Sequence, residues 1–154
     1  MAQAIPEGYE GLIHVLAVDD AEKAIEFYKE AFGASERMRM PSPDGRVAHA
    51  ELEIAGSLVM LSDPFEQAST TPPKQLGGIS GAAMFYVDDV DAAVEKAVNA
   101  GATVKVPVED QFWGDRYGKV TDPFGQEWQL ATHTEDVSEE EMAERGKEAM
   151  AGLE

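Results

Sequence analysis

The chain has 154 residues, of which 44% are apolar, and this is enough to bury the core of one compact domain. The absence of cysteine excludes disulfide bonds, thiolate metal sites and a cysteine nucleophile. Thirty acidic and 12 basic residues give a formal net charge of −18, which disfavours nucleic acid and anionic membrane surfaces as partners.

The first part of the chain reads as strand, helix and three further strands. Residues 12–18 form an apolar run of strand length. Asp19 or Asp20 then caps a helix whose apolar residues recur every three or four positions, and Gly33 ends it. Strands are expected over residues 36–40, 47–54 and 57–62. In residues 47–54, period-2 alternation places His49, Glu51 and Glu53 on one face and Ala48, Ala50, Leu52 and Ile54 on the other.

The second part repeats this order. Residues 63–78, rich in Pro, Ser, Thr, Gln and Gly, are expected to form a linker. A strand over residues 81–87 precedes a helix that is capped by Asp88 and ends near Gly101. Further strands are expected over residues 103–106, 119–121 and 127–131, with residues 109–118 as a loop. Ser138 then opens an amphipathic, acidic C-terminal helix.

Two stretches of the chain are near copies of each other. Residues 18–26 (VDDAEKAIE) and 87–95 (VDDVDAAVE) lie 69 positions apart, and residues 56–61 and 125–130 keep the same offset. This repeat predicts an α+β fold of two βαβββ modules, about residues 8–62 and 79–133, within one domain of residues 1–133. The acidic helix of residues 134–154 follows. Because each module has a helix on only one sheet face, the bare faces are expected to form a shared half-barrel cavity.

These features resemble the vicinal-oxygen-chelate superfamily, which includes glyoxalase I, bleomycin-resistance proteins and extradiol dioxygenases. The resemblance covers roughly residues 8–133. It rests on the motifs VDDA (18–21), AIEFY (24–28), FGA (32–34), VDDVD (87–91), NAGA (99–102) and DPFG (122–125), with Trp128. A closer resemblance to the PhnB-like branch rests on IPEGY (5–9), MRMP (38–41), PDGR (43–46), HAEL (49–52), DQFWGDRYG (110–118) and ATH (131–133), with the Glu-rich tail.

The resemblance implies a divalent metal held by His, Glu or Gln on the first and last strands of each module. The matching positions here are Ile13, Met60, Ala82 and Gln129. Ile and Ala have no donor atoms, the Met thioether is a soft ligand, and one Gln amide is not a site. We therefore predict no metal and no cofactor, and regard a divalent metal as disfavoured. His14 could replace Ile13 only if a bulge shifted the register, since alternation turns it toward the helix.

His49 and Glu51 are the candidates for catalysis. They share the strand face that is expected to line the cavity, where a neutral imidazole can act as a general base. The alternative is a structural histidine that forms hydrogen bonds to the segment of residues 111–117.

Ligand-binding candidates are concentrated in that segment. Trp113 and Tyr117 offer flat apolar surface with polar edges, and Arg116 could bind a carboxylate or phosphate of a ligand. Gln111, Met60 and Gln129 complete the predicted ligand-binding set. In the competing interpretation, Asp115 pairs with Arg116 and the segment locks one module against the other.

We favour a small-molecule binding protein of the glyoxalase/bleomycin-resistance type that lacks the usual divalent metal site. One alternative is a glyoxalase-like lyase or isomerase with His49 as general base, assisted by Gln129 or Glu51. Another is a dimeric structural or interaction protein whose C-terminal helix packs on a partner subunit. The expected partners are a small organic ligand and a second copy of the chain. The sequence has no run of ~20 apolar residues and no basic-then-apolar leader, so we expect a soluble, cytoplasmic protein without membrane contact.

Overall fold

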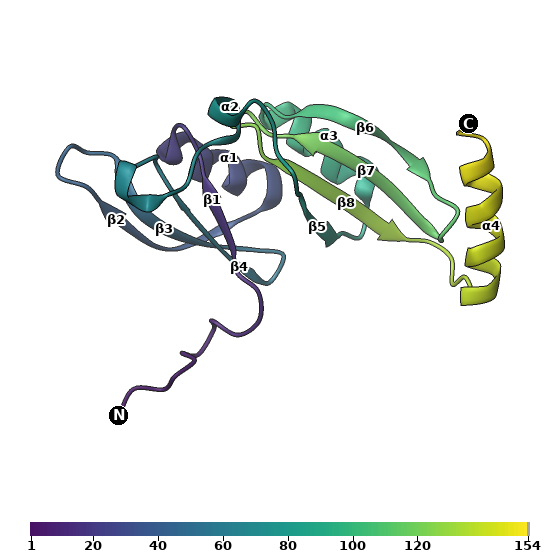
Figure 1. Ribbon diagram of the computed structural model, residues 1–154, viewed down its shortest axis with the longest axis horizontal. Helices are drawn as coiled ribbons and strands as arrows, with labels where there is room; N and C mark the ends of the chain where they lie inside the picture. The colour runs from purple at the N-terminus through teal and green to yellow at the C-terminus, as the bar shows by residue number, and fades with distance from the viewer. Residues whose placement is uncertain (154) are drawn as a thin grey trace.

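The computed structural model describes residues 1–153 and contains two modules of the same architecture (Figure 1). In the first module, β4 lies between β1 and β3, so the sheet order is β1-β4-β3-β2. Its elements are β1 (His14–Ala17), α1 (Ala21–Phe32), β2 (Ser35–Pro41), β3 (Val47–Ile54) and β4 (Ser57–Ser62).

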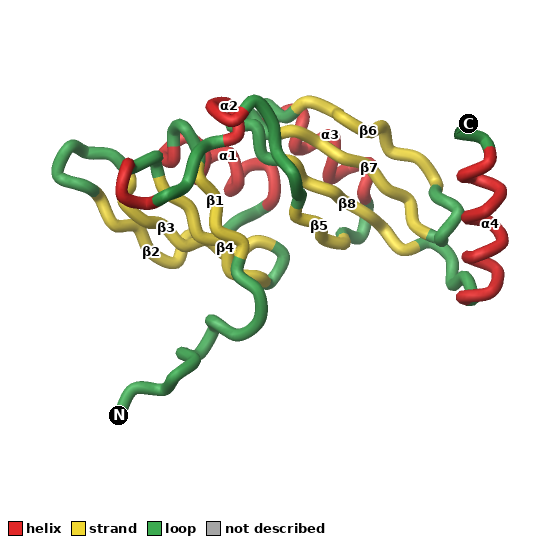
Figure 2. The backbone as a smooth tube through the Cα atoms, in the orientation of Figure 1, coloured by secondary structure: helices red, strands yellow, loops and turns green. Residues whose placement is uncertain are grey.

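The second module follows a linker that contains a short 3-10 turn (Glu66–Ala68) and the one-turn helix α2 (Pro73–Leu76). Its sheet has the order β5-β8-β7-β6. The elements are β5 (Ala83–Tyr86), α3 (Val90–Ala100), β6 (Thr103–Asp110), β7 (Asp115–Thr121) and β8 (Glu127–His133). Helix α4 (Glu139–Ala151) stands at the far end of this module, beyond the β6–β7 turn (Figure 2). Glu154, the last residue of the predicted tail, lies outside the described residues.

The repeat seen in the sequence is a repeat of structure. Strands β1 and β5 are offset by 69 residues at both ends, and α1 and α3 begin 69 residues apart. In each module the first strand pairs in parallel with the last, while the other pairs are antiparallel. The predicted α+β fold of two βαβββ modules with a C-terminal helix is confirmed. None of the helices within residues 1–153 is long and apolar enough to cross a membrane.

The helix caps follow the acidic residues, with one correction. Asp20 caps α1 by accepting a hydrogen bond from the backbone N–H of Lys23, and Gly33 ends the helix in the left-handed region at φ 66°. Asp89, not the predicted Asp88, caps α3, because α3 begins one residue later and the Asp89 side chain reaches the N–H of Ala92 at 3.0 Å. Ser138 caps α4 as predicted, through the N–H of Glu141.

The segment predicted as a loop over residues 109–118 is mostly strand. Strand β6 runs to Asp110 and β7 begins at Asp115, so only a four-residue turn remains. The glycine and polar residues that suggested a loop have another role. A Cβ at Gly118 would lie 2.8 Å from Cγ2 of Val108, so glycine allows β6 and β7 to approach closely. The last strand, predicted over residues 127–131, extends two residues further and ends at His133.

One buried carboxylate joins the two modules. The Tyr28 hydroxyl on α1 donates a 2.5 Å hydrogen bond to Asp122 in the β7–β8 turn, and Trp128 Nε1 donates to the same oxygen at 2.9 Å. The backbone N–H groups of Phe124 and Gln126 bind its other oxygen. Around this contact α1 packs against α3, so the helices of both modules share one core.

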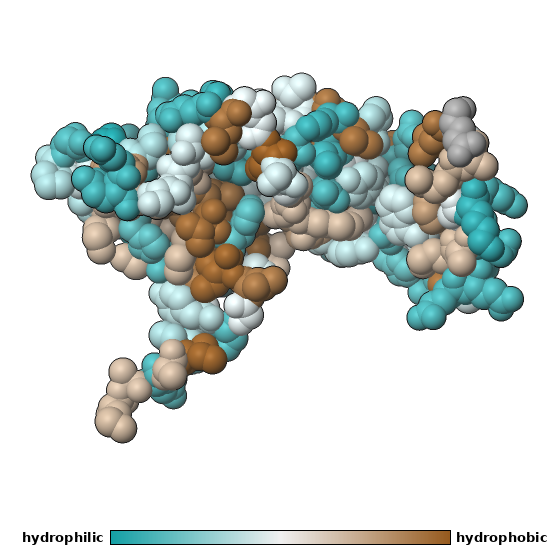
Figure 3. All heavy atoms as spheres, in the orientation of Figure 1, coloured by the Kyte–Doolittle hydropathy of each residue, from teal (hydrophilic) through white to brown (hydrophobic). Residues whose placement is uncertain are grey.

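The sheet faces opposite the helices remain open, and we call them the open faces. Their apolar side chains are exposed in a single chain: Val15 (60%), Met38 (38%), Met40 (51%), Met84 (44%) and Tyr86 (57%). Figure 3 shows apolar residues gathered over β1 and β4 on this side. No closed barrel forms within residues 1–153. One chain supplies the walls of the expected cavity without enclosing it.

Candidate ligand-binding faces

The open face of the first module is organised around Glu51. This carboxylate is 5% exposed, and it accepts hydrogen bonds from the Tyr9 hydroxyl at 2.7 Å and from His49 Nε2 at 3.1 Å. Burial acts to raise the pKa of Glu51, but the hydrogen bonds from Tyr9 and His49 outweigh it and lower the pKa overall. The same hydrogen bond to Glu51 raises the pKa of Tyr9. His49 and Glu51 therefore lie together, as predicted from strand alternation.

Tyr9 reaches this face from the N-terminal segment. The Arg37 guanidinium lies over the Tyr9 ring, 5.1 Å from its centroid, and its Nη1 donates to the carbonyl oxygen of Gly8 at 3.4 Å. These contacts hold the segment against the sheet, and they cover Glu51.

The open face of the second module carries a larger group, which we call the Asp115 cluster: Asp115, Tyr86, Trp113 and His133. One Asp115 oxygen accepts from the Tyr86 hydroxyl at 2.7 Å and from Trp113 Nε1 at 3.0 Å, and the other is 2.9 Å from His133 Nδ1. Asp115 itself is 3% exposed. The Trp113 ring also meets Tyr117 edge to face, with centroids 5.9 Å apart. A single buried acceptor thus fixes the orientation of three other side chains.

Hydrogen bonds within the cluster shift the pKa values of its ionisable side chains. Burial acts to raise the pKa of Asp115, but hydrogen bonds from Tyr86, His133 and Trp113 lower it overall. The pKa of His133 is raised by its hydrogen bonds to Asp136, at 2.8 Å from Nε2, and to Asp115. Proximity of the anionic Asp115 raises the pKa of Tyr86 through their hydrogen bond.

The β6–β7 turn also anchors the segment that leads into α4. The Gly114 carbonyl accepts the backbone N–H groups of Thr134 and Glu135, and Arg145 on α4 forms two hydrogen bonds with the Glu135 carboxylate. The turn that presents Trp113 to the open face is therefore the turn on which the C-terminal helix is held.

Arg116 is separated from the other ligand-binding candidates. It lies opposite Thr132, whose hydroxyl binds the first turn of α3, so Arg116 faces the helix side of the sheet. Its guanidinium forms a two-point contact with Asp91 at 2.6 and 2.9 Å and a third contact with Asp110 at 3.2 Å, and these contacts raise its pKa further. The Asp115–Arg116 pair of the competing interpretation does not form, because adjacent strand residues point to opposite faces.

Gln111 lies in the β6–β7 turn, where its side chain donates to the carbonyl oxygen of Glu109 at 3.2 Å. Met60 and Gln129 lie on the open faces of the first and second modules, beside Glu51 and Lys119 respectively. The structure brings Trp113 and Tyr117 together, whereas Met60 belongs to the other module and Arg116 to the other side of the sheet.

The residues at the family's metal positions do not fit a divalent ion. Met60 pairs with Val15, and Gln129 with Met84, so both side chains share a face with the strand positions at Ile13 and Ala82. Of the four, only Gln129 offers a hard donor atom. Within residues 1–153, no three His, Asp or Glu side chains are grouped so that they could hold a metal ion.

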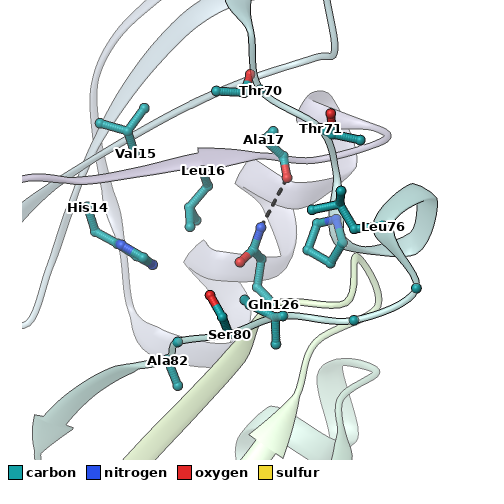
Figure 4. Close-up of a pocket in the computed structure, with 15 residues that line it drawn as sticks. His14, Val15, Leu16, Ala17, Thr70, Thr71, Leu76, Ser80, Ala82 and Gln126 are labelled. Atoms are coloured by element: carbon teal, nitrogen blue, oxygen red, sulfur yellow. Dashed lines mark hydrogen bonds between the residues drawn. The ribbon is translucent and has the colours of Figure 1, made fainter.

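Two cavities lie where β1 meets the second module, and His14 lines both. One, of about 480 Å³, lies between β1 and β5 and reaches the Trp128 ring, which meets the His14 ring edge to face at 6.2 Å. The other, of about 710 Å³, lies under the linker, where Gln126 Nε2 donates to the Ala17 carbonyl at 3.0 Å (Figure 4). Burial lowers the pKa of His14, as expected for an imidazole on the helix side without a carboxylate partner.

Four residues of these sites were not among the predicted site residues: Tyr9, Tyr86, Asp115 and His133. Tyr86 lies two positions from Met84 on the same strand face, and alternation alone would have placed it there. Asp115 and His133 are opposite one another across β7 and β8, and that register becomes visible only when both strands are known to extend so far.

Known proteins are similar to this chain in sequence and in fold. The Glyoxalase/Bleomycin resistance protein/Dioxygenase superfamily matches residues 11–130. The uncharacterised Mycobacterium bovis protein Mb0911c is 48% identical over 130 residues, which cover 82% of this chain and 86% of that protein. The structure of the Arabidopsis thaliana gene product At5g48480 is 34% identical, with a TM-score of 0.64 over 80% of this chain and 98% of that one.

The superfamily resemblance read from the sequence motifs is confirmed by these matches. A PhnB protein from Bacillus cereus has a TM-score of 0.60 over 80% of this chain and 99% of that one, and at 17% identity it shows the common fold. The chain belongs to the Glyoxalase/Bleomycin resistance protein/Dioxygenase superfamily.

Proposed function

We propose that this protein binds a small organic molecule on its open sheet faces, and that it does so without the divalent metal of its metal-dependent relatives. The observation that carries the proposal is the Asp115 cluster. A carboxylate that is 3% exposed holds a tyrosine, a tryptophan and a histidine in fixed orientations on a face whose apolar side chains are otherwise exposed. Rigid aromatic groups with a few fixed polar atoms are typical of ligand sites.

The absence of donor atoms at three of the four metal positions supports the metal-free part of this proposal. A chelated ion would have only the Gln129 amide among them, and neither Ile13 nor Ala82 can be recruited by a change of rotamer. Recognition of the guest then depends on ring stacking and hydrogen bonds.

We further propose that the binding unit is a homodimer. Val15, Met84 and Tyr86 are 60%, 44% and 57% exposed in one chain. A second copy placed with its first-module face over the second-module face would cover them and enclose a cavity. Each cavity would then combine the Asp115 cluster of one chain with the Glu51 group of the other.

A metal analysis and a ligand screen together test the proposed function. Protein purified without added ions is analysed for bound metal, and then screened by thermal shift against antibiotics and aromatic metabolites. We expect less than about 0.1 equivalent of metal, and a ligand whose stabilising effect is lost in Trp113→Ala but retained in Phe65→Ala, since Phe65 packs under Arg46 in the linker region. Near-stoichiometric Zn, Ni, Mn or Fe retained through Gln129 would overturn the metal-free assignment.

A second candidate function is favoured by a different contact. His49 and the buried Glu51 form an imidazole–carboxylate pair on the open face of the first module, which is the arrangement of a general base and the group that orients it. This supports a glyoxalase-like lyase or isomerase. If a turnover is found, His49→Ala should abolish it with folding intact, and His14→Ala is the matched histidine control. Turnover that survives His49→Ala removes this assignment.

A further inference from the structure

We propose that the Asp115 cluster selects an aromatic guest that carries a positive charge and discriminates against an anionic one. This inference rests on the binding role proposed above and assigns the chemical class of the ligand. It follows from three properties of the cluster: which hydrogen-bond donors are already used, which surfaces remain, and where the cations of the module lie.

The donors of the cluster are all occupied. The Tyr86 O–H and the Trp113 N–H both donate to Asp115 Oδ2. The two ring nitrogens of His133 face carboxylate oxygens of Asp115 and Asp136, at 2.9 and 2.8 Å. An anionic guest needs donors. Beside the cluster, the Tyr117 hydroxyl, which binds no other residue within 1–153, offers one neutral donor, and any donor of the cluster itself would have to leave a carboxylate that it already serves.

The surfaces that remain are those a cation prefers. Tyr86 is 57% exposed, and Trp113 and Tyr117 are half-buried, so each of these rings keeps part of its surface open, although Phe112 packs against Trp113 with centroids 5.1 Å apart. Trp113 and Tyr117 meet at an interplanar angle of 68°, so they present ring faces in two directions. Aromatic faces attract ammonium and guanidinium groups, most strongly where Trp contributes.

The cations of this sheet are already paired with carboxylates. Arg116 binds Asp91 and Asp110 on the helix side, away from the cluster. Lys119 and Lys105 both lie against the single carboxylate of Glu127, the former at 3.5 Å. Each lysine and arginine of β6 and β7 thus contacts a carboxylate, and the net charge of −18 adds a field that attracts cations.

A set of three probes with matched shape tests the inference. Isothermal titration of the full chain, at constant ionic strength, uses 1-naphthylmethylammonium, 1-naphthoate and cyclohexylmethylammonium. The first two share a ring and differ in charge, while the first and third share a charge and differ in aromaticity. We expect the naphthyl cation to bind about tenfold more tightly than naphthoate, and about fivefold more tightly than the cyclohexyl cation.

Two variants locate the effect. Trp113→Ala should weaken binding of the naphthyl cation about fivefold. Arg116→Gln, which changes charge on the helix side of the same strand, should alter the affinity of each probe by less than about twofold. Thermal unfolding of both variants shows whether the fold is kept. Trp113→Phe, which keeps a ring face, should restore most of the affinity lost in Trp113→Ala even where stability falls.

The outcomes separate this inference from the function on which it rests. Tighter binding of naphthoate, or loss of naphthoate binding in Arg116→Gln, would overturn the cation preference and leave a small-molecule site in place. Equal affinity for the naphthyl and cyclohexyl cations would reduce the effect to the overall negative charge and would also refute it. No saturable binding of any probe would count against both the preference and the proposed site.

Discussion

At the scale of single residues, Asp122 links the two modules. Its carboxylate is 4% exposed and is satisfied by two side-chain and two backbone donors. Burial nevertheless raises its pKa, and it also raises the pKa of Tyr28. Loss of any one of these donors destabilises the site, because a buried carboxylate oxygen cannot replace the missing hydrogen bond with one from water.

Removal of the Tyr28 hydroxyl tests this dependence. Tyr28→Phe should lower the free energy of unfolding by about 1–3 kcal/mol, since the ring still fills its place while Asp122 loses a 2.5 Å hydrogen bond. Urea denaturation measures the change. Tyr117→Phe is the control, because no hydrogen bond joins its hydroxyl to another residue within 1–153, and it should cost less than about 0.5 kcal/mol. Equal losses in the two variants would contradict the role of Asp122.

At the scale of elements, the β6–β7 hairpin supports α4 through a close backbone approach. Gly114 has φ +98°, and a Cβ there would lie 2.1 Å from the carbonyl oxygen of Glu135. Gly45, in the β2–β3 turn, has a similar φ of +86° but nothing within 4 Å of the Cβ position. An added Cβ would therefore cause only backbone strain at Gly45, but both backbone strain and a steric clash at Gly114.

Alanine at each position should show that difference. Gly45→Ala should cost about 1 kcal/mol, as expected for a left-handed position with open space. Gly114→Ala should cost more, by at least about 1 kcal/mol, because the segment of residues 134–138 must move. Hydrogen exchange of the Thr134 and Glu135 amides, which both bind the Gly114 carbonyl, should rise in Gly114→Ala only. Unchanged protection there would show that the segment is held elsewhere.

His133 makes the same attachment depend on pH. Hydrogen bonds to Asp136 and Asp115 raise its pKa above the ordinary 6.5, so the folded state binds a proton more tightly than the unfolded state. The contribution is fully present below about pH 6.5 and is lost as the pH rises through the folded-state value. We expect an NMR titration of His133 with a pKa above 6.5, and faster exchange above it of the Glu135 amide, which binds the Gly114 carbonyl in the same segment. In His133→Gln the exchange, corrected for its intrinsic rate, should no longer follow pH in this range.

The elements show what the sequence could and could not predict. The order of helices and strands followed from hydrophobic periodicity and from the repeat of 69 residues, because both depend on local pattern. The lengths of β6 and β7 did not, since Glu109, Asp110 and Asp115 are polar and β6 is irregular, with two register shifts. Once β7 is extended to Asp115, alternation separates Arg116 from Tyr117 and places Asp115 opposite His133. The sheet faces of Asp115, Arg116 and Tyr117 were not predicted because a strand was taken for a loop.

At the scale of the whole molecule, the two modules share their helices and leave their sheets uncovered. The core lies between α1, α3 and the inner sheet faces, and it includes Trp128 and Tyr28, which are 1% and 0% exposed. Large apolar side chains on the open faces are exposed to solvent in a single chain. Uncovered patches of this kind mark interaction surfaces in monomers that are otherwise well packed.

The proposed homodimer is tested by charge placed on that surface. Met84→Lys puts an ammonium group on the open face of the second module, where a second copy would have to bury it, and we expect it to shift the protein from dimer to monomer at about 50 µM. Val98→Lys is the control, because Val98 is similarly exposed (40% against 44%) but lies on α3. Light scattering coupled to size exclusion measures the mass of each. A monomeric wild type, or a dimer that tolerates Met84→Lys and not Val98→Lys, would mean that the sheets are not the interface, and that any ligand binds to a face that stays open to water.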